Sequence, residues 1–91
     1  MDKNTAIWKG MSFTLSKDDA NFAYHRGDCT KDCETLIKKK YVRKQLDSLT
    51  KEQMMAWMDD WGVFYDEGDM ECIEVCFVWM IAGEFSDNFI E

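Results

Sequence analysis

All four cysteines of the 91-residue chain occur in two pairs of identical spacing, CTKDC and CIEVC. On a helix, residues i and i+4 share a face, so each pair can direct two thiolates to one place. Four thiolates form the Cys₄ set of structural zinc sites, in which ligands are separated by similarly short spacings. The candidate zinc ligands are Cys29, Cys33, Cys72 and Cys76.

The surroundings of these cysteines favour a simpler interpretation. Thr30 is a good N-cap, which would leave Cys29 just outside the helix that follows it. Cys72 and Cys76 belong to the most apolar segment of the chain. Cysteine thiols are among the most buried groups in proteins and pack as small hydrophobes. We therefore predict core thiols and no cofactor, and keep a zinc-stabilised module as the alternative.

The twin C-x₃-C spacing also resembles that of the mitochondrial intermembrane-space chaperones. The resemblance covers only the two cysteine pairs, and here 38 residues separate Cys33 from Cys72, more than in that family. It implies a helical hairpin held by two disulfides, Cys29 to Cys76 and Cys33 to Cys72. This oxidised hairpin is the second alternative.

Charge is distributed unevenly along the chain. All eleven lysines and arginines lie in residues 1–51, against seven acids, whereas residues 52–91 hold eleven acids and no lysine or arginine. An acidic segment repels nucleic acid and anionic membranes and attracts basic protein surfaces. We predict a recognition surface in this segment, with Trp61, Phe64 and Tyr65 as aromatic anchors. The predicted partner-binding residues are Asp59, Asp60, Trp61, Phe64, Tyr65, Asp66, Glu67, Asp69, Glu71 and Glu74.

The sequence gives little indication of catalysis or of nucleic-acid binding. His25 is the only histidine, and the chain has no Gly-rich phosphate loop and no nucleophile-elbow motif, so we predict that the protein is not an enzyme. The basic stretch Lys38–Lys44 could suggest nucleic-acid binding, but the net charge of −7 opposes it. We expect this stretch to pair with the acidic half, within the chain or across a dimer. We also expect the protein to be a homo-oligomer, since the predicted helices offer more apolar surface than four short helices easily bury.

The hydrophobic pattern predicts a mostly α domain spanning residues 1–91, with residues 1–6 disordered. Period-two alternation over 7–15 indicates a short strand or extended arm. Helices are expected over 17–26, capped by Ser16, and over 31–47, capped by Thr30. The apolar face of the second of these switches sides at Lys38–Lys40, so it bends there or buries its two ends against different elements.

The two remaining helices complete a bundle of three to four. Thr50 and Gln53 form a capping-box pattern that opens a helix ending at Gly62. Residues 70–82 are apolar nearly all round, which favours a central buried helix. The β-branched residues Val75, Val78 and Ile81 keep open an α+β alternative in which 72–81 is a strand.

Together these patterns predict a non-catalytic, acidic protein-interaction module or inhibitor that binds a basic protein surface. A nucleic-acid-binding protein is the expected kind of partner, because rows of carboxylates can imitate phosphates. In size and charge the chain resembles virus-encoded inhibitors of host or defence enzymes. MDKNTAIWKG has no apolar signal-peptide region, and the longest uncharged apolar run, Val75–Gly83, is too short to span a bilayer. We therefore expect a cytoplasmic protein, in the host cytoplasm if viral, with no membrane partner.

Overall fold

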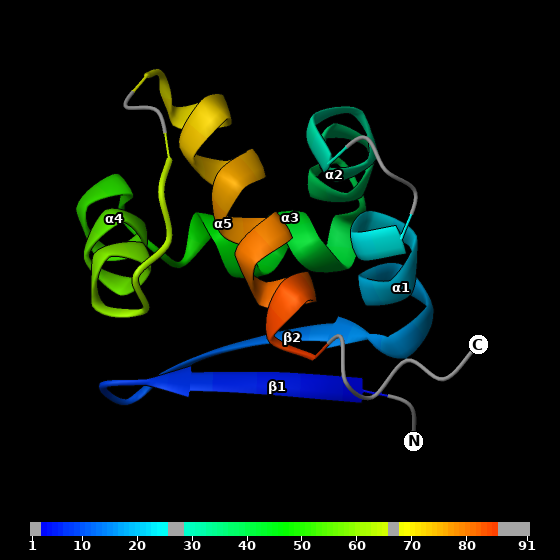
Figure 1. Ribbon diagram of the computed structural model, residues 1–91, viewed down its shortest axis with the longest axis horizontal. Helices are drawn as coiled ribbons and strands as arrows, with labels where there is room; N and C mark the ends of the chain where they lie inside the picture. Colours follow the sequence, from blue (N-terminus) through cyan, green and yellow to red (C-terminus); the bar gives the residue numbers. More distant parts are fainter. Residues whose placement is uncertain (1–2, 26–28, 66–67, 86–91) are drawn as a thin grey trace.

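The computed structural model describes residues 3–25, 29–65 and 68–85 of the chain. Within these ranges a two-stranded antiparallel hairpin precedes five helices, which confirms the predicted mostly α fold with strand structure at the N-terminal end. Figure 1 shows helix α5 (Met70–Glu84) in the middle of the molecule, with the other helices around it and the hairpin across its C-terminal end. Helix α5 contacts α1, α2, α4 and strand β2.

The hairpin is formed by β1 (Lys3–Trp8) and β2 (Met11–Ser16). Lys9 and Gly10 connect the strands, and both have positive φ angles, 49° and 82°. Two such residues make the tight turn whose twist matches that of paired strands. The turn falls inside the segment 7–15 predicted as one strand or arm, so that segment is instead the end of β1, the turn and most of β2. The partner strand comes from the same chain. Disorder over residues 1–6 was wrong for residues 3–6, which belong to β1, while residues 1–2 lie outside the described part.

One face of the hairpin belongs to the core. Ala6 and Trp8 of β1, and Phe13 and Leu15 of β2, are buried. The alternate residue Ile7 points the other way and is 70% exposed. Residues of β1 and β2 thus alternate between core and solvent, as the side-chain period of a strand requires.

The helix predicted over 31–47 is two helices, α2 (Cys29–Ile37) and α3 (Lys40–Asp47). The break falls at the predicted switch of apolar face, since Lys39 has extended backbone angles and precedes α3. Separation allows Leu36 and Val42, on opposite sides of the predicted helix, both to be buried. Thr30 is the second residue of α2, so its prediction as the N-cap was wrong.

Two predicted helix starts are confirmed. Helix α1 (Lys17–His25) follows Ser16, whose hydroxyl accepts the backbone N–H of Asp19 at 3.1 Å. Helix α4 (Lys51–Asp60) opens with the full capping box, in which Thr50 accepts the N–H of Gln53 and the Gln53 side chain accepts the N–H of Thr50. The predicted end of α1 at Gly27 lies outside the described residues.

Segment 72–81 is helical throughout, so the α+β alternative was wrong. Most of its apolar residues are buried because α5 has neighbours on several sides, whereas Trp79 is 37% exposed. A continuous series of ring contacts joins the hairpin, α4 and α5. Trp8 stacks on Trp57 with 5.6 Å between ring centroids, Trp57 meets Phe77 edge-on at 5.0 Å, and Phe77 meets Phe13 edge-on at 5.2 Å. Such pairs add stabilisation beyond the area that they bury.

Candidate functional site

The chain leaves α4 through a tight, fully specified turn. Gly62 has a φ of +72°, and its N–H donates to the carbonyl of Asp59 at 3.2 Å. The N–H of Val63 donates to the carbonyl of Met58 at 3.0 Å. This pair of bonds around a left-handed glycine is the Schellman motif, which satisfies the last carbonyls of a helix. The direction of the residues after Gly62 is therefore fixed by the end of α4.

The next three residues alternate between core and solvent. Val63 and Tyr65 are half-buried and pack against the core, and the Tyr65 hydroxyl donates to Asp59 Oδ1 at 2.9 Å. Phe64, between them, is 100% exposed. A phenyl ring left wholly in water is unfavourable for the isolated chain, because burying such a side chain is worth about 1.5–3 kcal/mol. The two packed neighbours hold Phe64 outward.

Carboxylates before and after Phe64 in the chain accept hydrogen bonds from neutral donors. Asp59 accepts the Tyr65 hydroxyl, and Asp60 accepts the indole N–H of Trp8 at 2.7 Å. At the start of α5, Asp69 accepts the backbone N–H of Cys72 at 3.0 Å. Each bond fixes a carboxylate without neutralising it. We name residues 59–65 together with 68–71 the acidic connector.

Lys51 lies beside the acidic connector. The Lys51 ammonium donates to the backbone carbonyl of Gly68 at 2.8 Å. The hydrogen bond from the Cys72 backbone lowers the pKa of Asp69, and the charge of Lys51 contributes to the same shift. Across the described part of the chain, no lysine or arginine forms a salt bridge with Asp59, Asp60, Asp69 or Glu71. The connector thus keeps its negative charge on the surface.

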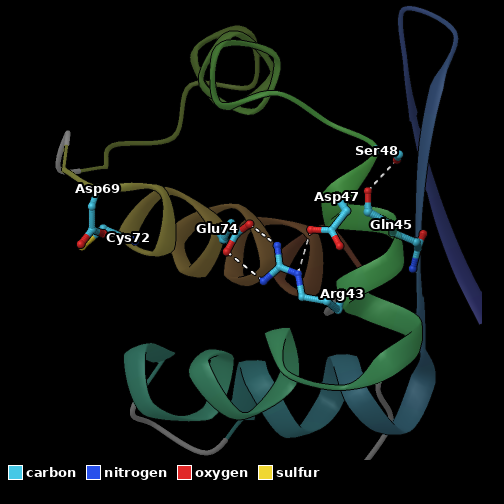
Figure 2. Close-up of polar contacts among 7 residues, drawn as sticks. All are labelled: Arg43, Gln45, Asp47, Ser48, Asp69, Cys72 and Glu74. Atoms are coloured by element: carbon cyan, nitrogen blue, oxygen red, sulfur yellow. Dashed lines mark hydrogen bonds and ion pairs between the residues drawn. The ribbon is translucent and has the colours of Figure 1, made fainter.

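Glu74 differs from the other predicted partner-binding residues. It is only 4% exposed, and both of its carboxylate oxygens accept hydrogen bonds from the Arg43 guanidinium of α3. Arg43 also donates to Asp47 at 3.0 Å through Nε, as Figure 2 shows. The hydrogen bond to Glu74 is the main cause that raises the pKa of Arg43. Glu74 is therefore a fold residue and is unavailable to a partner.

The rest of the predicted set divides between exposed and structural positions. Trp61 is half-buried, with its ring edge-on to Trp57 at 5.6 Å, so it anchors this part of the connector to α4. Glu71 is exposed in the first turn of α5. Asp66 and Glu67 lie outside the described residues.

The cysteines do not share one environment. Cys33 is buried as predicted, whereas Cys72 is exposed because it lies in the first turn of α5, beyond the core. A hydrogen bond with Asp69 and the charge of that carboxylate raise the pKa of the Cys72 thiol, which disfavours the reactive thiolate. Cys33, Cys72 and Cys76 are thiols rather than disulfide-bonded, so the predicted Cys33–Cys72 bridge is absent. The side chain of Cys29 lies outside the described part.

Neither a metal centre nor a membrane span emerges from the described residues. No three histidine, cysteine or carboxylate side chains gather there in a group that could hold a metal ion. In the same residues, no helix combines the length and apolar character that crossing a bilayer requires.

The sequence contained unused signals for this site. WGVF places glycine and then an apolar residue directly after a helix, which is the pattern of a Schellman end, and it predicts that Val63 turns inward. The bond from Trp8 to Asp60 joins residues 52 positions apart, and no local pattern could reveal it.

Comparison of the chain with protein-family models, with curated proteins and with solved structures finds no match.

Proposed function

We propose that the protein is a non-catalytic interaction module that inserts Phe64 into an apolar pocket bordered by basic residues on a partner protein. The observation that carries the proposal is the complete exposure of Phe64 between two packed neighbours. Hot spots of protein interfaces are commonly aromatic anchors that fill a pocket on the partner. The packed neighbours Val63 and Tyr65 fix the backbone on both sides of Phe64, so little backbone entropy is lost on insertion.

Charge defines the surroundings of the pocket. Asp59 and Asp60 precede the anchor in the chain and Asp69 and Glu71 follow it, and no lysine or arginine forms a salt bridge with these carboxylates in the described part of the chain. Such carboxylates accelerate association with a basic surface and select against acidic partners. A protein that binds nucleic acid offers a surface of this kind. The module would then act as an inhibitor, by covering residues that otherwise contact phosphates.

The test is comparative affinity capture from the organism that makes the protein. Three baits are needed: the natural chain, Phe64→Ala, and a control, Tyr41→Ala, which removes another exposed ring, 47% exposed, from the basic helix α3. We expect one protein to be captured by the natural chain and by the control and lost with Phe64→Ala. Equal capture by all three baits would refute the role of Phe64.

Charge is tested separately, with variants at positions other than the cap of α5. Asp69 is unsuitable for charge reversal because it caps α5. Glu71→Gln removes a charge of the acidic half without removing a side-chain hydrogen bond that the structure describes, and Asp66→Lys with Glu67→Lys reverses two further charges of the same half. We expect each to weaken binding of the captured protein, with the difference from the natural chain shrinking as salt is added. Binding that does not respond to salt would exclude the electrostatic part of the proposal.

A further inference from the structure

The outer edge of β2 is closed by a side chain. Gln45 of α3 donates to the carbonyl of Thr14 at 2.8 Å and accepts the N–H of Thr14 at 2.7 Å. Figure 2 shows the Gln45 side chain extending from its helix toward the strand. This primary amide forms the same two bonds that a neighbouring strand would form, so no further strand can pair with β2 at Thr14.

The bonds from Gln45 also fix the direction of the backbone groups of β1. Thr14 is paired with Thr5, and its N–H and carbonyl point away from β1. Opposite residues of an antiparallel pair are alike in this respect, so the N–H and carbonyl of Thr5 point away from β2. The pattern repeats every second residue, and Ile7 presents the same groups. No hydrogen bond in the described part of the chain uses the backbone groups of Thr5 or Ile7 on that side.

Side chains along β1 indicate what the open edge would accept. Ile7 is 70% exposed, and Thr5 is exposed with its hydroxyl 2.9 Å from that of Thr14. The hairpin, residues 3–16, contains two lysines, Lys3 and Lys9, and no acid, in a chain whose net charge is −7. Lys9, at the turn, is exposed and lies 4.8 Å above the Trp8 ring. The hairpin is therefore a basic, partly apolar strand edge on an acidic protein.

We propose that the outer edge of β1 binds an extended acidic segment of a partner protein by strand addition. In the antiparallel register, the added strand places a carboxylate opposite Lys9, an apolar side chain opposite Ile7 and a hydroxyl opposite Thr5. Backbone bonds to Thr5 and Ile7 supply affinity, and these side chains supply preference. The site is separate from Phe64 and does not depend on the function proposed above.

Charge favours an acidic strand over β1 of a second copy. A second copy would bring its own lysine-bearing hairpin to the edge, whereas carboxylates complement Lys9. Pairing satisfies the open backbone groups of β1 and of the added strand. It also covers the Ile7 side chain, which is otherwise exposed to water.

The experiment measures binding of a capped, fluorescent peptide, ETVSTSE, to the full chain by anisotropy. We expect saturable binding and amide shift changes over residues 3–9 in NMR spectra, and much weaker binding of the control peptide KTVSTSK. Thr5→Pro removes an outward N–H that the hairpin does not use, so the hairpin is expected to remain folded. Thr5→Pro should weaken the binding of ETVSTSE by about tenfold, which is the effect of losing one hydrogen bond and leaving the peptide carbonyl that accepted it unpaired.

Lys9→Glu is the second variant and leaves the backbone edge intact. Lys9→Glu should weaken the binding of ETVSTSE by about fivefold, as expected for the loss of a charge contact at the surface. It should strengthen the binding of KTVSTSK. If Thr5→Pro unfolds the chain, as circular dichroism would reveal, Lys9→Glu decides alone. The proposal would be overturned if ETVSTSE does not bind, or if both peptides bind equally. It would also be overturned if sedimentation shows a dimer that excludes the peptide and that Lys9→Glu leaves unchanged.

Discussion

Glu74 and the acidic connector present carboxylates in two opposite ways, although both belong to the same acidic half of the chain. Glu74 is buried, and Arg43 binds both of its oxygens. The carboxylates of Asp59, Asp60 and Asp69 are at the surface, where each accepts a hydrogen bond from a donor without charge. The charge of Glu74 is neutralised by an ion pair with Arg43. The carboxylates of the connector are fixed in position by neutral donors and keep their negative charge.

The difference shows that a run of acids in the sequence need not form an acidic surface. Whether a carboxylate keeps its charge at the surface depends on whether the hydrogen-bond donor that binds it is charged or neutral. A guanidinium removes the field of a carboxylate, while a hydroxyl, an indole or a backbone N–H orients it and leaves the field in place. The acidic connector is a candidate for recognition because it combines this remaining charge with the exposed ring of Phe64.

The largest effect is expected where the charge is buried. Arg43→Met leaves Glu74 in the core without a counter-charge and should lower the free energy of unfolding by about 3 kcal/mol. This is the low end for a broken buried pair, because the Arg43 side chain is 36% exposed. Urea denaturation followed by tryptophan fluorescence measures the change.

The matched control removes both charges. Arg43→Met with Glu74→Leu should recover to within about 1 kcal/mol of the natural chain, because no unpaired charge remains. A double variant as unstable as Arg43→Met would show that lost packing, rather than a stranded carboxylate, explains the single variant.

A smaller effect is expected at the end of α4. Gly62→Ala forces a side chain into a left-handed conformation and should lower the free energy of unfolding by about 1–2 kcal/mol. Gly62→Asn should lower the free energy of unfolding much less, since asparagine tolerates this conformation. Both values come from the same urea titration. Equal losses would show that the conformation of Gly62 does not limit stability.

Acid should weaken the start of α5. The bond from Cys72 lowers the pKa of Asp69 below its ordinary value of 3.8, so the carboxylate form is favoured in the folded state. A lowered pKa stabilises the fold above the ordinary value, and that contribution is lost as pH falls through the folded value. Asp69→Ser keeps a cap and does not titrate. Its melting temperature should match the natural chain near neutral pH and fall less steeply below pH 3.8; parallel curves would contradict this.

Phe64→Ala should change stability least. The side chain is wholly exposed, so its removal should alter the free energy of unfolding by no more than about 0.5 kcal/mol. Thermal melting measures this directly. A clear loss of stability would mean that Phe64 belongs to the fold, and the contrast between Glu74 and the connector would fail.

Local patterns predicted much of the fold, because short-range chemistry determines those features. Ser16 and Thr50 start helices through bonds three residues away. The break between α2 and α3 was visible only as a switch of apolar face near Lys39, since the choice between a bend and two helices depends on neighbouring elements. The burial of Glu74 could not be predicted, because its partner Arg43 lies 31 residues earlier.

The candidate site was predicted in the same uneven way. Composition indicated the acidic segment and its aromatic residues, and alternation around Phe64 follows once Gly62 is recognised as a helix end. The exposure of Cys72 was missed because an apolar segment was assumed to be buried over its whole length. Its first turn instead extends past the core, where Asp69 caps it.

The most direct measurement compares two exposed rings against the same partner. The captured protein is titrated calorimetrically with the natural chain, Phe64→Ala and Tyr41→Ala. We predict that Phe64→Ala weakens binding by at least about thirtyfold, the effect of losing a hot-spot residue worth about 2 kcal/mol, and that Tyr41→Ala changes it less than about twofold. Equal affinities for all three chains would contradict the assignment of the acidic connector as the binding site.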